Sequence, residues 1–387
     1  MTMATPLRVG VAGLGAAGLA FLPALQTHPG FTWVACAEPV DALRALMQHE
    51  HGVAAYATLA ALLEHPGLDA VIVATPTPLH APQTLQVAAT GKHVLVEKPM
   101  AVDLDDARAM VEAADRAGVV LLVGHAHGYD EPIAAMRSLI ASGELGAVGM
   151  VNTWCFSDWV VRPRRPDELD VAQGGGVTFR QGSHQFDILR LLCGGRARSV
   201  RAKAFDWDPE RRTVGAHIAF IDFADGPAAT AVYNGYGGFS SMDLCFDISE
   251  WGLHQPPGQR HRLPRPGSAA DELQAKRERA RSAIPAAAPH APFFGLTLVS
   301  CERGDIRQAP NGLRIHTPEG TREMPLPLQR SPREHVLDEW HAAITGSAPA
   351  LHSGRWGLAN LELCVAALSS SRAAREITLH EQVPLPG

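Results

Sequence analysis

Short apolar segments alternate with amphipathic stretches of helical period over the first third of the chain. The apolar segments predict strands at 8–12, 33–37, 70–73, 93–96 and 119–124. The stretches between them predict helices at 17–26, 41–49, 59–63, 82–90 and 104–117. This regular alternation predicts an α/β fold with a doubly wound parallel sheet, which binds ligands at the carboxyl ends of its strands.

The pattern changes after a linking helix predicted at 131–142. Strand-like runs follow at 148–156, 200–205, 217–223, 228–233 and 245–249, with one helix among them at 183–192. This predicts an α+β domain with a large, mostly antiparallel sheet that has one open face. Segment 253–292 interrupts the pattern with one charged helix at 269–282, and helices at 333–345 and 354–375 close the chain.

The length of 387 residues fits two domains. We place an N-terminal Rossmann domain at 1–126 and a C-terminal α+β domain for substrate binding and oligomerisation at 127–387, whose last helices can pack back on the first domain. Two subunits can bury an open sheet face against each other, so we expect a homodimer or a homotetramer.

Composition narrows the class of protein. A hydrophobic fraction of 46%, a charged fraction of 19% and a net charge of -6 fit a soluble globular protein and favour neither nucleic acid nor a membrane as partner. No apolar run approaches the ~20 residues of a membrane span, and a first strand near Leu7 leaves no room for a signal peptide. The six cysteines contain no Cys-x-x-Cys pair, so we expect reduced thiols, no metal site and a cytoplasmic location.

The sequence RVGVAGLGAAGL joins the first predicted strand to the first predicted helix. Its Gly13, Gly15 and Gly18 have the spacing that allows a tight turn, close approach of the backbone to a pyrophosphate, and packing of helix on strand. Glu38 ends the second strand, where a carboxylate can accept a hydrogen bond from an adenosine ribose and repel a 2′-phosphate. These features predict an NAD site, although a glycine turn in another kind of α/β unit is an alternative.

A lysine follows the fourth predicted strand, in Glu97-Lys98-Pro99. Lys98 can donate to a substrate hydroxyl, stabilise the alkoxide and relay its proton. A lysine that only extends to solvent is the alternative. Glu97 can neutralise Lys98 or bind groups on the nicotinamide side, and Pro99 is a candidate for a cis peptide bond.

A glycine run at 174–176 precedes the helix predicted at 183–192, and His184 lies in the first turn of that helix on the same side as Asp187. The usual pKa of histidine suits a general base near neutral pH, while a structural histidine is the alternative. Upstream, a proline-punctuated loop carries three arginines whose guanidinium groups can bind a carboxylate or pair with nearby acids: Arg162, Arg164 and Arg165.

Together these motifs make the chain resemble the Gfo/Idh/MocA oxidoreductases along nearly its whole length. The segments that carry the resemblance are VGVAGLG, Thr75-Pro76-Thr77-x-x-His80 and GKHVLVEKP. The resemblance implies that Lys98 and His184 are catalytic. It also implies an NAD site built from Gly13, Gly15, Gly18, Glu38, Thr75, Pro76, His80 and Glu97.

Arg180 departs from the family pattern, because the family usually has an aspartate four residues before this histidine. With the arginine loop, it makes the chain similar to the phthalate 4,5-cis-dihydrodiol dehydrogenase branch. That branch implies NAD-dependent oxidation of a secondary alcohol on a small cyclic, carboxylated cis-diol. Arg180 and the loop arginines Arg162, Arg164 and Arg165 would hold the carboxylate, and His127 would also bind substrate. An Arg180 that turns away and pairs with an acid such as Asp187 is the alternative. Alternatives are a sugar or inositol dehydrogenase, a redox-neutral NAD-using enzyme and a non-catalytic NAD-binding sensor.

Overall fold

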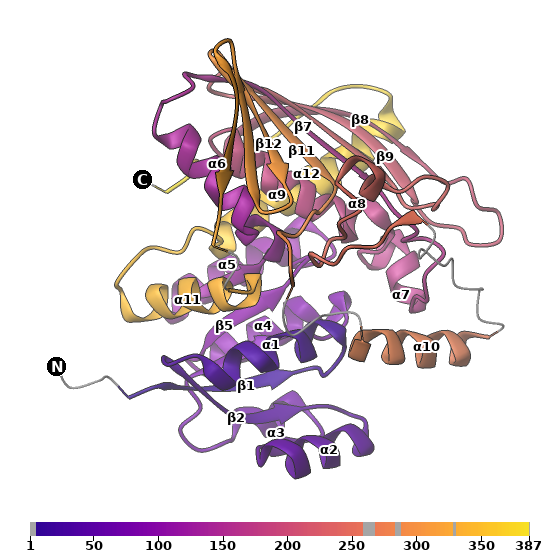
Figure 1. Cartoon of the computed structure of the whole chain (residues 1–387). Coiled ribbons are helices and arrows are strands. Elements are labelled where there is room, and N and C mark those ends of the chain that lie inside the picture. The colour runs from indigo at the N-terminus through magenta and orange to yellow at the C-terminus, as the bar shows by residue number, and fades with distance from the viewer. Residues whose placement is uncertain (1–4, 258–267, 283–287, 328–329, 387) are drawn as a thin grey trace.

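The computed structural model describes residues 5–257, 268–282, 288–327 and 330–386. A Rossmann domain lies below a broad second sheet, with helices between them (Figure 1). Part of segment 253–292 lies outside the described residues, but its predicted helix is present as α10 (Ala269–Ser282). Among the described helices, none combines the length and the apolar character that crossing a membrane requires.

The first sheet has six parallel strands in the order β3-β2-β1-β4-β5-β6, which confirms the predicted Rossmann topology. Its strands are β1 (Leu7–Ala12), β2 (Phe31–Ala37), β3 (Ala54–Tyr56), β4 (Ala70–Val73), β5 (His93–Glu97) and β6 (Leu121–Gly124). Its helices are α1 (Ala16–Thr27), α2 (Asp41–His51), α3 (Leu59–Leu63), α4 (His80–Ala89) and α5 (Leu104–Ala117). The sequence analysis missed β3, whose three residues are too few to show a period.

The second sheet has nine strands in the order β14-β13-β12-β11-β7-β10-β9-β8-β15. Its pairs are antiparallel except for β7 with β10, so the prediction of a mostly antiparallel sheet is confirmed. The strands are β7 (Val148–Phe156), β8 (Ala197–Phe205), β9 (Ala216–Phe223), β10 (Ala228–Asn234), β11 (Leu296–Cys301), β12 (Gly304–Ala309), β13 (Gly312–Thr317), β14 (Gly320–Pro325) and β15 (Ile377–Thr378).

The strand predicted at 245–249 is wrong. The chain there leaves a 3-10 helix, Ser241–Leu244, and places Phe246 and Asp247 at φ values of 58° and 60°. Two consecutive left-handed residues cannot continue an extended strand. The strands that complete this edge of the sheet, β11 to β14, are later short hairpin strands that the sequence analysis did not identify.

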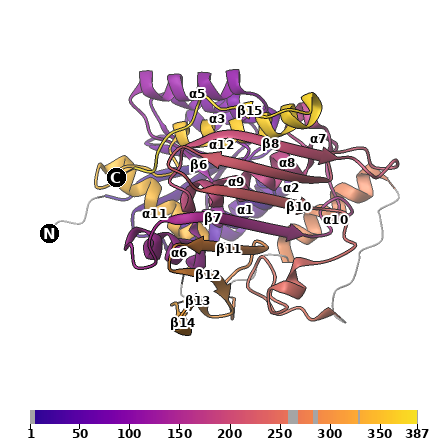
Figure 2. The ribbon, with the colours of Figure 1, turned by 90° about the horizontal axis from the view of Figure 1, so that it is seen from above.

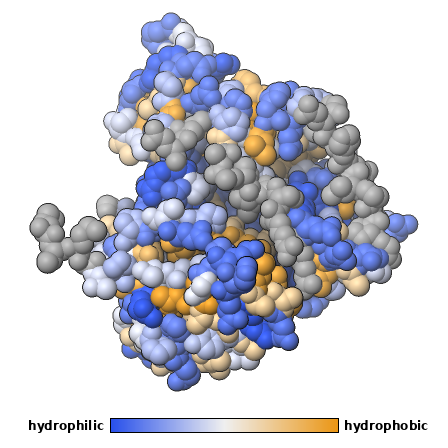
Figure 3. Space-filling view, turned by 60° about the horizontal axis from the view of Figure 1, so that its bottom comes forward, coloured by the Kyte–Doolittle hydropathy of each residue, from blue (hydrophilic) through white to orange (hydrophobic). Residues whose placement is uncertain are grey.

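Helices cover one face of the second sheet, and the other face is open (Figure 2). The remaining helices are α6 (Glu131–Ala141), α7 (Pro166–Leu169), α8 (Gly176–Arg180), α9 (Gly182–Leu192), α11 (Pro332–Thr345) and α12 (Gly354–Ala373). The short helices α7 and α8 were not predicted. The face in Figure 3, on the side of the Rossmann domain, mixes hydrophilic and hydrophobic residues.

The last two helices return to the Rossmann domain. Val336, Leu337 and Trp340 of α11 join the buried cluster that contains Phe21 and Phe31. Between α11 and α12, the carbonyl oxygen of His352 accepts from the backbone N–H of Val123 in β6 at 2.9 Å. Residues from the end of the chain therefore reach the carboxyl edge of the parallel sheet.

Candidate active site

The glycine-rich turn between β1 and α1 shows why each glycine is present. Gly13 has a φ of +89°, and a Cβ there would lie 2.8 Å from the carbonyl oxygen of Ala74. A Cβ on Gly18 would lie 2.0 Å from the carbonyl oxygen of Gly13, whereas a Cβ on Gly15 would meet nothing within 4 Å. Gly13 and Gly18 thus close the turn, and Gly15 leaves open the approach to the N-terminus of α1 that a pyrophosphate needs.

The Glu38 carboxylate lies against this turn at the end of β2. Its Oε2 accepts from the backbone N–H of Leu14 at 3.0 Å, and its Oε1 accepts from that of Val40 at 3.2 Å. An acid held beside the glycine turn is placed to bind the ribose of a dinucleotide. The turn, the open helix N-terminus and the carboxylate together fit a nicotinamide dinucleotide.

His80 bridges two loops at the carboxyl edge of the parallel sheet, the one after β4 and the one after β5. Its Nε2 faces the carbonyl oxygen of Thr75 at 2.8 Å, and its Nδ1 faces that of Pro99 at 2.8 Å. The Thr75 hydroxyl also donates to Gln83 at 2.6 Å. Pro76 is the N-cap of the one-turn 3-10 helix Thr77–Leu79 that follows. His80 therefore holds the segment after β4 against the segment that carries Lys98.

Lys98 directly follows β5, and its peptide bond to Pro99 is cis. The Lys98 ammonium donates to the backbone carbonyl of Arg180 at 2.9 Å. Burial and the nearby Arg180 guanidinium lower the pKa of Lys98 to about 7. Lys98 can therefore exchange a proton near neutral pH.

Glu97, the residue before this lysine, accepts from Arg333 of α11 at 2.6 Å, and the Arg333 guanidinium stacks on the Phe21 ring. The sequence analysis missed Arg333, because no local motif marks a partner 236 residues away. Glu97 is thus neutralised chiefly from α11, and its second oxygen accepts from the backbone N–H of Lys98 at 3.2 Å.

His184 lies in the first turn of α9, as predicted. Its ring centroid lies 4.6 Å from that of His127 and 5.0 Å from that of Phe294. Its Nδ1 is buried and has no hydrogen-bond partner among the described residues. Burial and the positive charge of Lys98 hold the pKa of His184 well below its usual value. The ring is therefore neutral at pH 7 and can accept a proton or a hydrogen bond from a substrate hydroxyl.

His127 is the second histidine at this place. It stacks on Phe294 with a centroid distance of 4.4 Å, and its Nδ1 lies 2.9 Å from an Asp130 oxygen. The structure thus brings His127, a candidate for substrate binding, into contact with His184.

Arg180 ends α8 beside Lys98. Its guanidinium donates to the Thr77 hydroxyl at 2.7 Å and to Glu168 at 3.3 Å. The Glu168 carboxylate is buried and also faces Arg164, at 3.9 Å, and Lys276 of α10. Burial opposes the charge on Glu168, but Arg180, Lys276 and Arg164 outweigh it and hold its pKa well below the usual value. Sequence motifs indicated neither Thr77 nor Lys276 as part of this group.

The three loop arginines do not converge on one point. Arg162 pairs with Asp158 and, at 3.3 Å, with Glu250. Arg165 makes two hydrogen bonds of 2.8 Å to Asp167, which is the local pairing weighed as an alternative. Arg164 stacks over the Trp159 ring at 4.1 Å, and its guanidinium lies 3.9 Å from Glu168.

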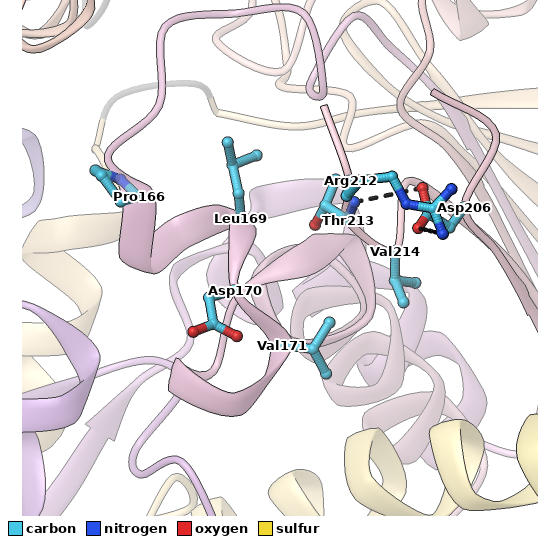
Figure 4. Close-up of a pocket in the computed structure, with 8 residues that line it drawn as sticks. All are labelled: Pro166, Leu169, Asp170, Val171, Asp206, Arg212, Thr213 and Val214. Atoms are coloured by element: carbon cyan, nitrogen blue, oxygen red, sulfur yellow. Dashed lines mark hydrogen bonds and ion pairs between the residues drawn. The ribbon is translucent and has the colours of Figure 1, made fainter. Parts of the chain in front are cut away.

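An open pocket lies on the second domain, and its lining includes Pro166 and Leu169, the neighbours in sequence of Arg165 and Glu168 (Figure 4). Leu169 and Val171 line one side, and an ion pair of 3.0 Å between Arg212 and Asp206 lines the other. Its lining includes neither Lys98 nor His184. In the described part of the chain, no group of three or more His, Cys, Asp or Glu side chains could hold a metal ion.

Two family models together match most of the chain. The model of an oxidoreductase family with an NAD-binding Rossmann fold matches residues 7–125, and that of the GFO/IDH/MocA C-terminal domain matches residues 133–243. The chain belongs to the Gfo/Idh/MocA oxidoreductase family. It is therefore an NAD(P)-dependent dehydrogenase of this family, as its sequence predicted.

Similar proteins agree with this assignment. A 1-carboxy-3-chloro-3,4-dihydroxycyclohexa-1,5-diene dehydrogenase of Comamonas testosteroni is 35% identical over 378 residues, which are 95% of each chain. The scyllo-inositol 2-dehydrogenase (NAD(+)) of Bacillus subtilis is 29% identical over 196 residues, 50% of this chain and 56% of the relative. A crystal structure of a protein assigned as a dehydrogenase from Bordetella bronchiseptica RB50 has a TM-score of 0.85 and 36% identity, covering 97% of this chain and 100% of its own.

Proposed function

We propose that this dehydrogenase oxidises a secondary alcohol of a carboxylated cyclohexadiene cis-diol, with NAD as the hydride acceptor. The alcohol carbon gives up a hydride and its hydroxyl gives up a proton, and the resulting ring ketone tautomerises to a catechol. The name of the Comamonas testosteroni relative describes a ring of this kind, with a carboxyl group at carbon 1 and hydroxyls at carbons 3 and 4.

The observation that carries the proposal is the position of Arg180 next to Lys98. The Lys98 ammonium reaches the Arg180 carbonyl, and the Arg180 guanidinium shares the Glu168 carboxylate with other cations. A hydroxyl bound at Lys98 and a carboxylate bound near Arg180 can therefore belong to one small ring. Guanidinium groups bind carboxylates through charge-assisted hydrogen bonds, whereas an uncharged sugar or inositol offers only hydroxyls.

Lys98 and His184 divide the proton chemistry in this proposal. The lowered pKa of Lys98, about 7, allows the amine to take the hydroxyl proton near neutrality. The neutral ring of His184 accepts a hydrogen bond from the diol and orients it. NAD supplies the acceptor carbon for the hydride, and the surrounding protein holds the alcohol in line with it.

The direct test is an NADH-absorbance assay of the purified protein with four substrates: a carboxylated cis-dihydrodiol, the same diol without carboxylate, an inositol and an aldose. The proposal expects the highest kcat/KM with the carboxylated diol. A preference for the inositol or the aldose would contradict it. Cofactor that survives purification without net NADH release would favour the redox-neutral alternative, and no turnover of any substrate would favour a sensor.

We also propose that the cofactor is NAD rather than NADP. Glu38 lies beside the glycine turn, where it can meet the adenosine ribose. Its carboxylate would repel a 2′-phosphate, and no basic residue follows it in Glu38-Pro39-Val40-Asp41. The expected result is a kcat/KM for NAD that exceeds the value for NADP by at least tenfold. Comparable values for the two cofactors would refute this proposal.

The chain is further proposed to form a homodimer or a homotetramer through the open face of the second sheet. This face exposes large apolar side chains on β7 and β9, the two strands that flank β10, with exposed fractions of 52% for Met150, 42% for Trp154, 51% for Ile218 and 49% for Phe220. Apolar patches of this kind mark contact surfaces. All six cysteines are free, which fits the reducing cytoplasm that we propose as its location.

A further inference from the structure

Helix α10 carries a row of charged side chains that the dehydrogenase reaction leaves unexplained. Glu272, Lys276 and Arg279 stand four and three residues apart, so they lie along one side of the helix. The side chains of Glu272 and Lys276 are only 16% and 18% exposed, although α10 is rich in charge. The charged row is thus turned towards the protein rather than towards solvent.

This row contacts the loop that precedes the active-site helices. The Glu272 carboxylate accepts from the backbone N–H of Arg164 at 2.7 Å and pairs with Arg211. The Lys276 ammonium pairs with Glu168. The helix also contacts α1 of the Rossmann domain, beside which it lies in Figure 1. Helix α10 therefore contacts both domains and places Lys276 beside Glu168, the carboxylate with which Arg180 also pairs.

Positive charge is in excess at this acid. The single Glu168 carboxylate faces Arg180 at 3.3 Å, Arg164 at 3.9 Å and the ammonium of Lys276. Burial lowers the pKa of Lys276; Glu168 opposes this, and Arg164 adds to it. Burial likewise lowers the pKa of Arg164 to about 10. Buried cations in excess over their carboxylate are stabilised by a further anion.

We propose that Lys276 determines the specificity for anionic substrates by binding the substrate carboxylate together with Arg180. An ammonium has three N–H donors, and its pair with Glu168 needs one of them. The remaining donors can bind an oxygen of a ring carboxylate whose diol lies at Lys98. This inference rests on the proposed function, because it assigns the carboxylate of that substrate to a residue of α10.

A purely structural role would make Lys276 only an anchor for α10, and the experiment separates the two roles. Calorimetry measures the binding of benzoate and of its uncharged counterpart benzamide to the full-length protein saturated with NAD. The variants are Lys276→Met, which keeps the aliphatic stem, and Lys276→Arg, which keeps the charge. Lys92→Met, in the loop before β5, is the matched control. Thermal melting of each variant verifies that it folds.

The inference expects Lys276→Met to weaken benzoate binding about tenfold or more, since hydrogen bonds to charged groups are strong. Benzamide binding stays unchanged, Lys276→Arg retains most of the benzoate affinity, and Lys92→Met matches the wild type. Unchanged benzoate affinity in Lys276→Met overturns the inference. Three other results also overturn it. These are an equal loss of affinity for benzoate and for benzamide, a loss of folding in both Lys276→Met and Lys276→Arg, and a wild type that does not bind benzoate.

Turnover of the carboxylated diol is measured separately, so that the two proposals can fail independently. Benzoate binding that depends on Lys276 without any diol turnover contradicts the proposed function and leaves the inference standing. Diol turnover with an unchanged KM in Lys276→Met contradicts the inference and leaves the proposed function standing.

Discussion

The surroundings of the Lys98 amine and the His184 ring disfavour the protonated, positively charged form of each group. Burial acts on both, and the Arg180 guanidinium adds to it at Lys98, as the Lys98 charge does at His184. A lysine of ordinary pKa would keep its proton at neutral pH and could not act as a base. Lys98 and His184 can therefore accept a proton near neutral pH.

We predict that kcat/KM for alcohol oxidation rises with pH through about 7 and levels off above it, because Lys98 must lose its proton to act as the base. Lys98→Met should reduce kcat by ~10²–10³-fold, since it removes a group that acts in the transition state. NAD binding, measured by calorimetry, should stay close to that of the wild type. A variant within a few-fold of wild-type turnover would exclude Lys98 from catalysis.

Arg180 should discriminate between charged and uncharged substrates. Arg180→Ala removes the donor shared between Thr77 and Glu168, so KM for a carboxylated diol should rise about tenfold or more. KM for the same diol without carboxylate should change little. Steady-state kinetics on this pair of substrates gives the result. Equal losses on both substrates would mean that Arg180 serves only to hold the local structure.

At the scale of elements, helix α9 is tied to α11 and α12 by a buried ionic chain. Asp187 accepts from the Trp356 indole at 2.7 Å and pairs with His352 at 3.5 Å, and His352 in turn lies 3.2 Å from Glu339. Burial opposes the charge on His352, but the two carboxylates outweigh it and raise its pKa to about 9. Asp187 lies one helical turn after His184, so this buried ionic network fixes the orientation of α9, the helix that carries His184.

His352→Gln should destabilise the protein by about 3–5 kcal/mol, the cost of leaving buried charges without their partner. Because folding raises the pKa of His352, its contribution to stability is complete below about pH 6.5, the pKa in the unfolded chain. That contribution is lost as pH rises through about 9. Denaturant unfolding at several pH values should show this decline in the wild type. The same slope in His352→Gln would contradict the assignment.

Elements with strong local signals were predictable, and those without them were not. Helix α5 has the predicted bounds because Asp103 caps its first turn and Gly118 ends it in the left-handed conformation. The helices α7 and α8, of four and five residues, are too short to show a helical period. The strand predicted at 245–249 does not form because Phe246 and Asp247 adopt left-handed backbone angles. No glycine at these positions indicated such angles in the sequence.

At the scale of the whole molecule, the open sheet presents an apolar row across several strands. Trp154 of β7 pairs in register with Val232 of β10, which pairs with Ile218 of β9. Side chains at paired positions lie on the same face of a sheet. The exposed Trp154 and Ile218 therefore belong to one continuous surface, which a second copy of the chain can cover isologously.

Ile218→Lys combined with Phe220→Lys should dissociate the oligomer into a smaller species. Both side chains are about half exposed, at 51% and 49%, and the proposed subunit interface would cover them with apolar surface, where two lysine charges are unfavourable. Light scattering at micromolar concentration measures the mass. The same pair of changes should leave the fold intact by circular dichroism. A wild-type protein that is already monomeric would contradict the proposed contact.

The sequence by itself determined the features that depend on neighbouring residues. The glycine turn, the acid after β2 and the lysine after β5 belong to short motifs whose geometry is local, so Gly13, Glu38 and Lys98 were predictable. The alternation of strands and helices determined the Rossmann topology, because parallel strands require crossover helices.

Only the tertiary structure decided which oppositely charged side chains, distant in sequence, pair with each other. Glu97 meets Arg333 across 236 residues, and Glu168 meets Lys276 across 108. Both acids lie earlier in the sequence, and both cations lie on later helices, α11 and α10, that pack back against them. Pairing over such distances depends on where whole elements dock, and no local pattern records this. The physical reason is that the position of a helix depends on the apolar surface that the whole fold buries and on the charges that it brings together, and not on the residues next to it in sequence.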